Sequence, residues 1–252
     1  MDWRTVVVVG VFFGATLIRS ALGFGEALIA VPLLAFVLPV QVAAPVAALI
    51  SITVAVVVVA QDWRHVQLRS AAWLVLSSFV GIPFGLLLLR NVPESVVKGI
   101  LGVLVALFAV FMLRRRHAYE LADDRLAWLF GVSAGVLGGA YGMNGPPLVV
   151  YGALRRWPPE RFRATLQGYF LPASLMGMIG YWAAGLWTPS VSRDYLLSLP
   201  TALLAIPLGR AINRRFDAQR FLVYVHAALI ASGAGLLLQA IVAWASHQPA
   251  AR

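Results

Sequence analysis

The chain has 252 residues, of which 61% are hydrophobic and only 12% charged, and its mean hydropathy is +0.84. Soluble domains are nearer half apolar and a quarter charged, so this composition excludes an ordinary soluble protein. The formal net charge of +10 would suit nucleic acid, but in so apolar a chain we expect the basic residues to lie in the loops that orient membrane spans. The absence of cysteine excludes disulfides and thiol chemistry.

Ten apolar segments follow one another along the chain, and long apolar runs of this kind are typical of membrane spans. The first five cover residues 5–22, 27–38, 42–59, 70–89 and 95–113. The second five cover residues 126–141, 146–154, 162–186, 195–212 and 221–245. We therefore predict an all-α integral membrane protein, a helical bundle without a soluble domain.

The two sets of five segments are predicted to be an internal duplication. The stretch "GFG" at 23–25 precedes "GMN" at 142–144 by 119 residues, and "LPVQVAA" precedes "WPPERFR" by the same distance. A constant offset between weakly similar stretches is typical of internal repeats. It predicts membrane repeat 1 at residues 1–113, an inter-repeat linker at 114–124 and membrane repeat 2 at 125–252.

The two repeats are expected to be inverted in the bilayer, because each has an odd number of segments. If the N-terminus is outside, 14 Lys and Arg residues fall in inner loops and 5 at outer ends, and the positive-inside rule favours this orientation. The second segment of each repeat is too short to cross the membrane upright, so the first two segments form a broken or re-entrant pair. Eight and ten crossings both remain open.

Each short segment follows a glycine-rich break, "GFGEA" or "GMNGPP". Unpaired backbone groups at a break cannot face lipid, so we expect both breaks to line an enclosed cavity near the membrane midplane. Helix N-termini offer N–H donors and partial positive charge to an anion. Pro146 suits the first turn of a helix, and Asn144, which precedes it, is a favourable N-cap residue. The predicted anion-binding residues are Gly23, Gly25, Glu26, Ala27, Gly142, Asn144, Gly145 and Pro146.

Two charged residues, Arg19 and Glu26, are predicted to lie inside apolar segments. Intramembrane charge costs at least about 2.5 kcal/mol and usually marks an ion or substrate path. One alternative is a buried ion pair that only holds the hairpin together, and another is that Glu26 takes up a proton when the anion binds. Ser51, Gln167 and Tyr169 are polar pathway candidates on the third segments, where interhelical bonding is the alternative role.

Two further patterns have simpler structural explanations. Gly131, Gly135 and Gly139 recur every four residues, which predicts a close helix contact. Arg161 and Arg163 in "RFRATL" lie at the predicted inner face, where they serve as positive-inside anchors or recruit anions to the inner mouth.

Three stretches carry a resemblance to a known family: "LGFGEALIAVPLL", "LLLLRNVPESVVKGILGVLVALFAVFML" and "GMNGPPLVVYGALRRWPPERFRATLQGYFLP". Through them, over about residues 22–237, the chain resembles the sulfite exporter TauE/SafE family of bacterial membrane permeases. The resemblance implies a duplicated helical bundle in the bacterial inner membrane. It also implies a substrate among sulfite, organosulfonates, related sulfur oxyanions and small carboxylates. Many members have a third glycine in the first motif, where this chain has Glu26.

Together these observations predict a secondary transporter of a small anion, such as sulfite or an organosulfonate, with proton coupling as an option. The alternatives are a carrier of a small carboxylate or a cation, and a non-transporting membrane scaffold subunit. No HExxH, Walker loop or acidic metal cluster is present, so we expect no enzyme activity, no cofactor and no metal. The expected partners are the small anion and the lipid bilayer, without nucleic acid, and a homo-oligomer is left open.

Overall fold

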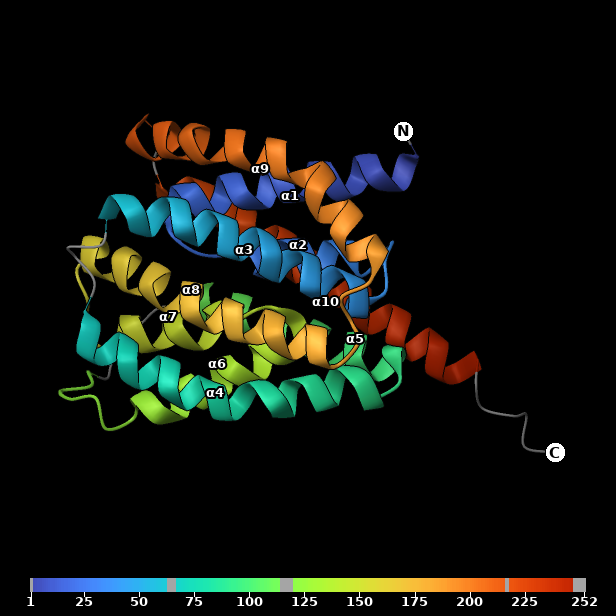
Figure 1. The fold of residues 1–252 in the computed structure, drawn as a ribbon, viewed down its shortest axis with the longest axis horizontal. Coiled ribbons are helices and arrows are strands. Elements are labelled where there is room, and N and C mark those ends of the chain that lie inside the picture. Colours follow the sequence, from blue (N-terminus) through green and yellow to red (C-terminus); the bar gives the residue numbers. More distant parts are fainter. Residues whose placement is uncertain (1, 63–66, 114–119, 216–217, 247–252) are drawn as a thin grey trace.

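The computed structural model describes residues 2–62, 67–113, 120–215 and 218–246 (Figure 1). Several predicted inner-loop residues, namely Arg64, Arg114, Arg115 and Arg116, lie outside the described residues, as does the 114–119 part of the predicted linker. Within the described ranges the secondary structure is helical, without strands. The all-α prediction is therefore confirmed.

The helices of the first half are α1 (Trp3–Leu22), α2 (Glu26–Leu34), α3 (Val40–Asp62), α4 (Leu68–Asn91) and α5 (Glu94–Leu113). Those of the second half are α6 (Ala127–Tyr141), α7 (Gly145–Leu154), α8 (Pro159–Ala183), α9 (Pro189–Arg215) and α10 (Ala218–Ser246). Each of the ten predicted apolar segments thus coincides with one helix.

Two helix ends differ clearly from the prediction. The second helix stops at Leu34 instead of 38, because a turn precedes Pro39 and the residue before a proline avoids the helical conformation. Helix α9 begins at Pro189 instead of 195, since proline is favoured in the first helical turn. The polar residues that follow Pro189 therefore belong to a helix end, where the prediction placed a loop.

Both predicted breaks interrupt the helices at glycines with positive φ. Helix α1 ends at Gly23 with φ 89°, α2 follows Gly25 with φ 103°, and α6 ends at Gly142 with φ 63°. A residue with a Cβ pays roughly 1–2 kcal/mol in this left-handed region, so glycine is favoured at each of the three positions. The glycines that stood out in the sequence are therefore the residues at these helix boundaries.

The most extensive helix contacts join the two halves: α4 packs on α6, α1 on α9, α5 on α10, and α3 on α8. In the predicted duplication α1 corresponds to α6 and α4 to α9, so the α1–α9 and α4–α6 pairs are equivalent. Figure 1 shows that counterparts run in opposite directions, since α3 runs from right to left and α8 from left to right. This is the arrangement that inverted repeats require, and the repeat relation itself stays a prediction.

The close contact predicted for the glycines of α6 is confirmed, and its partner is α4. A Cβ at Gly135 would overlap the backbone of Ser78, and one at Gly139 would overlap that of Ile82. Glycines on α4 repeat the pattern, because a Cβ at Gly81 would overlap the α6 backbone at Val132. Small residues that let two backbones approach are a common device of helix packing in membranes.

The fold presents an apolar surface suited to lipid. Within the described residues, five helices are long and apolar enough to cross a membrane: α1, α3, α4, α5 and α9. Large hydrophobic side chains are exposed along the outer face of α4, including Trp73, Leu76, Val80, Phe84 and Leu87. The charged pair Arg19 and Glu26 is buried, at 3% and 2% exposure. Apolar outside and charged inside is the expected pattern for a multi-pass membrane protein.

Candidate functional site

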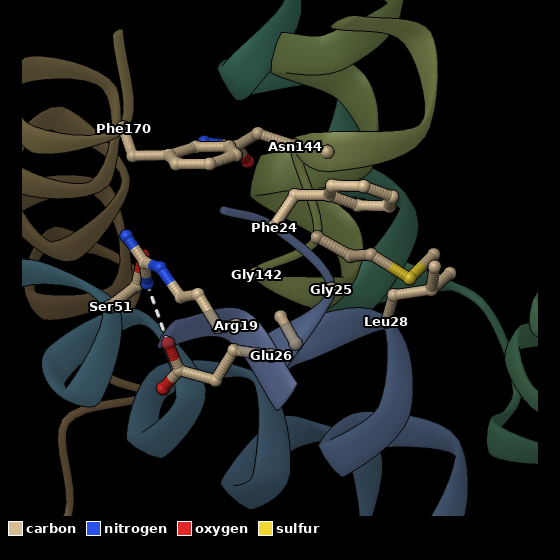
Figure 2. A pocket seen from close by; sticks show the side chains of 12 residues that line it. Arg19, Phe24, Gly25, Glu26, Leu28, Ser51, Gly142, Asn144 and Phe170 are labelled. Atoms are coloured by element: carbon tan, nitrogen blue, oxygen red, sulfur yellow. Dashed lines mark hydrogen bonds and ion pairs between the residues drawn. The ribbon is translucent and has the colours of Figure 1, made fainter. Parts of the chain in front are cut away.

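A small cavity lies between the two helix breaks (Figure 2). The first half contributes the end of α1, the start of α2 and a turn of α3, and the second half contributes the start of α7 and a turn of α8. Its lining residues are Arg19, Phe24, Gly25, Glu26, Ala27, Leu28, Ser51, Gly142, Met143, Asn144, Gly145 and Phe170. The two breaks, which are far apart in the sequence, therefore meet at one site.

Arg19 is the centre of the polar network in this cavity. Its Nη1 lies 2.5 Å from Glu26 Oε2 and also donates to Ser51 Oγ at 2.9 Å. Its Nη2 donates to Gln167 Oε1 at 2.7 Å. One guanidinium therefore joins α1, α2, α3 and α8, and the ion pair that the sequence offered as an alternative is present.

The surroundings of Arg19 hold it in one orientation. The Phe170 ring lies 5.0 Å from the guanidinium carbon, which is within the range of a cation–π contact. The amide of Gln167 donates onward to Gly23 O at 2.8 Å, which ties α8 to the break. Ser174 Oγ donates to Ser51 Oγ at 3.3 Å and so fixes the serine that faces Arg19.

In the part of the chain that the structure describes, three polar atoms of the cavity residues are buried without a hydrogen-bond partner: Arg19 Nε, Glu26 Oε1 and Asn144 Oδ1. An unsatisfied buried polar atom costs about 1–3 kcal/mol, so a cluster of three requires an explanation. A ligand that exchanges hydrogen bonds with some of these groups is one such explanation, and it is the one that a cavity between two helix N-termini favours.

The two helix N-termini are unequal as anion sites. In α2 the first intrahelical hydrogen bond runs from Ile29 N to Gly25 O. The N–H groups of Glu26, Ala27 and Leu28 therefore have no acceptor within the helix. In α7 the second and third positions are prolines, which have no N–H. Backbone donors for an anion therefore come mainly from α2.

The prediction that the Asn144 side chain caps α7 is wrong. Asn144 has helical backbone angles, φ −79° and ψ −15°, and makes no side-chain cap bond. An N-cap side chain accepts from the N–H of the second or third helical residue, and both of these are prolines here. Its Oδ1 instead packs against Gly138, where a Cβ would overlap it, and the residue lines the cavity.

The structure gathers most of the predicted site residues and leaves four outside this cavity. Six of the predicted binding residues line it, as do Arg19 and Ser51. Gly23 and Gln167 line a second cavity on the other side of Arg19. Pro146 is buried in the first turn of α7, and Tyr169 is buried on α8, and neither is among the residues that line these two cavities.

Sequence reasoning missed the apolar wall of the cavity, which is formed by Phe24, Leu28, Met143 and Phe170. The repeat offset contained the signal, because Phe24 and Met143 are 119 residues apart, as are Ser51 and Phe170. In the described part of the chain no group of three or more His, Asp or Glu side chains is placed to hold a metal ion. Arg19 and the first N–H groups of α2, beside this apolar wall, suit a small anion with an apolar part.

Comparison with known proteins agrees with this geometry. The family model described as "Sulfite exporter TauE/SafE" matches residues 7–236. A "Probable sulfite/organosulfonate exporter TauE" from Cupriavidus necator (strain ATCC 17699 / DSM 428 / KCTC 22496 / NCIMB 10442 / H16 / Stanier 337) is 23% identical over 210 residues, which cover 82% of each chain. No solved structure matches the chain.

The matched family consists of membrane transporters, so the predictions of a multi-pass membrane protein without enzyme activity are confirmed. Because the match spans nearly the whole helical bundle, both breaks and the cavity between them lie within it. The chain belongs to the sulfite exporter TauE/SafE family.

Proposed function

We propose that the protein is a secondary transporter that carries sulfite or a small organosulfonate across the bacterial inner membrane, with its N-terminus outside. The observation that carries this proposal is the buried Arg19–Glu26 pair in a cavity between two helix breaks. Charged groups inside a membrane bundle mark substrate and ion paths, and discontinuous helices form the binding sites of many secondary transporters.

The lining of the cavity supports a sulfur oxyanion as the substrate. Arg19 and the first N–H groups of α2 are donors suited to an oxyanion. In the same cavity, Phe24, Met143 and Phe170 form an apolar surface that suits the carbon end of a sulfonate. The printed name of the Cupriavidus relative includes sulfite and organosulfonate, which supports the same substrate class.

We further propose that transport is coupled to one proton, which Glu26 takes up. In the empty cavity the charges of Arg19 and Glu26 cancel. A monovalent anion adds one negative charge, and a proton on Glu26 removes one, so the loaded site is neutral as well. Binding without the proton would leave an uncompensated buried charge, which costs several kcal/mol. A protonated Glu26 also becomes a hydrogen-bond donor toward the anion.

The substrate proposal is tested by flux into proteoliposomes loaded with buffer alone. Sulfite, methanesulfonate, thiosulfate, sulfate and acetate are offered in turn, and we expect sulfite and methanesulfonate to enter fastest. Uptake of acetate ahead of both would contradict the assignment, and the absence of flux for every anion would favour the scaffold alternative.

The proton proposal is tested with Glu26→Gln, which keeps the shape of the side chain and cannot ionise. We expect this variant to lose accumulation driven by a pH gradient at zero membrane potential while it still exchanges substrate for substrate. Glu94→Gln, which changes a carboxylate paired with Lys98 at the start of α5, is the matched control and should behave as wild type. Undiminished accumulation by Glu26→Gln would make Glu26 structural.

A further inference from the structure

A second cavity lies on the other side of Arg19, and three arginines line it, of which Arg19 is paired with Glu26. Arg19, Arg163 and Arg210 line it together with Ser20, Gly23 and Gln167. Within the described residues this lining contains three arginines and no carboxylate. Since the central cavity is also lined by Arg19, one guanidinium is shared between two adjacent spaces.

The position of this second cavity along the helices places it toward one end of the bundle. On α3 it is lined by Val54 and Val58, one and two turns beyond the Ser51 of the central cavity. On α8 it is lined by Arg163 and Gln167, which precede Phe170 of the central cavity. Because α3 and α8 run in opposite directions, both shifts point to the same end (Figure 1). The positive-inside orientation makes this the cytoplasmic end.

The separation between the two cavities is made of side chains held by hydrogen bonds. Arg19 Nη2 donates to Gln167 Oε1, and Gln167 Nε2 donates to Gly23 O at the break. Arg163 packs directly on this break, since a Cβ at Gly23 would lie 2.6 Å from Arg163 Cγ. An anion that moves between the two cavities must therefore exchange hydrogen bonds with Arg19 and Gln167.

A buried hydroxyl supplies an observation independent of the arginines. Ser20 lines the second cavity and is 4% exposed, and its Oγ has no hydrogen-bond partner among the described residues. The Nε of Arg19 is likewise buried without a partner. Cationic side chains beside an unsatisfied donor that is shut off from lipid are what an anion site requires.

We propose that this second cavity is a separate anion-binding site, in which Arg163, Arg210 and Ser20 hold a sulfur oxyanion on the cytoplasmic side of Arg19. The inference rests on the proposed function, because it makes the second site a stage on the same transport path. The anion meets Arg19 from this side before or after it occupies the central cavity. Two sites that share one cation allow the ion to move without leaving its counter-charge.

The experiment measures the number of sulfite ions bound per chain by equilibrium dialysis of the purified protein with radiolabelled sulfite under anaerobic conditions. We expect two ions per wild-type chain. Arg210→Gln and Ser20→Ala should each weaken sulfite binding at the second cavity about tenfold, because each variant loses one good polar contact. Binding at the central cavity should be unchanged. Arg125→Gln removes a side chain that is 89% exposed and should bind as wild type does.

A central-cavity variant separates this inference from the function on which it rests. Asn144→Leu should lose the first binding event and keep the second. A contrary result is a single sulfite ion bound by the wild type, whose binding is abolished by Asn144→Leu and unaffected by Arg210→Gln. That result would refute the second site and leave the proposed function standing. If the wild type binds no sulfite, both proposals fail. An equal loss of both binding events in Arg210→Gln and Ser20→Ala would also refute a separate site.

Discussion

At the scale of single residues, the site depends on a guanidinium that makes three different hydrogen bonds. Arg19 bonds to Glu26, Ser51 and Gln167, and each bond uses the planar geometry of its donors. A lysine at the same position would keep the charge but would present a point-like ammonium on a flexible stem. The arrangement of donors, beyond the charge itself, is therefore expected to matter for the anion.

Arg19→Lys is predicted to weaken sulfite binding about tenfold, because an ammonium cannot hold Glu26, Ser51 and Gln167 in the observed geometry. Binding is measured on purified protein, with the melting temperature as a check on folding. Arg156→Lys, at a side chain that is 56% exposed, is the control. Unchanged sulfite affinity in Arg19→Lys would mean that Arg19 supplies charge alone.

Asn144→Leu is predicted to abolish binding at the central cavity without lowering the melting temperature. Asn144 makes no cap bond and its Oδ1 is buried without a partner, so its replacement removes an unsatisfied group. If the side chain were a true cap, its loss would instead cost about 1 kcal/mol of stability. A lower melting temperature with intact sulfite binding would contradict this account.

At the scale of helices, a close seam between two helices and a half-buried carboxylate each hold neighbouring elements together. The seam is the α4–α6 contact at Gly135 and its neighbours, where the backbones touch. The carboxylate is Asp124, which accepts from Ser70 Oγ at 3.1 Å and from Tyr151 OH at 2.5 Å and lies 3.5 Å from Arg155 Nε. Asp124 therefore ties the end of the inter-repeat linker to α4 and α7.

Gly135→Ala is predicted to destabilise the protein strongly, because the added methyl group would overlap Ser78 O in the seam. Gly10→Ala is the matched control, since nothing lies within 4 Å of its Cβ position and alanine favours the helix. Thermal unfolding in detergent compares the two variants. Equal melting temperatures would show that the seam tolerates a side chain.

Asp124→Ala is predicted to lower the free energy of unfolding by about 2–4 kcal/mol, because it leaves Tyr151 and Arg155 without their shared acceptor. The adjacent Asp123→Ala should change it little, since that carboxylate is 56% exposed and pairs only with the exposed Arg125 in the described structure. Denaturant unfolding measures both variants, and equal losses would contradict a structural role specific to Asp124.

Which features could be predicted from the sequence follows from how local their causes are. The ten helices and the glycines at the two breaks, Gly23, Gly25 and Gly142, depend on nearby residues, and the sequence predicts them. The lack of a side-chain cap bond at Asn144 was not predicted, although the two prolines after it already showed that no N–H was available for a cap. Phe170 and Asp124 depend on which helices pack together, which a single sequence does not specify.

At the scale of the whole molecule, eight of the twelve residues that line the cavity form pairs between the two halves. Phe24 and Met143, Gly25 and Asn144, Glu26 and Gly145, and Ser51 and Phe170 all line it, and each pair is separated by 119 residues. Such pairs are expected around a pseudo-two-fold axis that passes through the cavity. Within each pair the chemistry differs, and among these pairs only the first half carries a charge.

Inversion of the halves predicts the sidedness of the loops, and the cysteine-free chain makes a direct test convenient. Arg125→Cys, before α6, should resist a membrane-impermeant maleimide in intact cells, and Ser190→Cys, in the first turn of α9, should react. Both positions are exposed, so accessibility depends on the side of the membrane. The reverse labelling would overturn the predicted orientation, and equal labelling would contradict the assignment of these loops to opposite sides.

The central claim is that the Arg19–Glu26 cavity stays neutral by moving one proton with each monovalent anion. The most direct measurement is the ratio of proton flux to anion flux in proteoliposomes, made with methanesulfonate because its charge does not change with pH. The account predicts a ratio of about one, unaffected by an imposed membrane potential of either sign, since moving net charge would cost about 2.3 kcal/mol per 100 mV. Anion flux without proton flux, driven by the membrane potential, would contradict it.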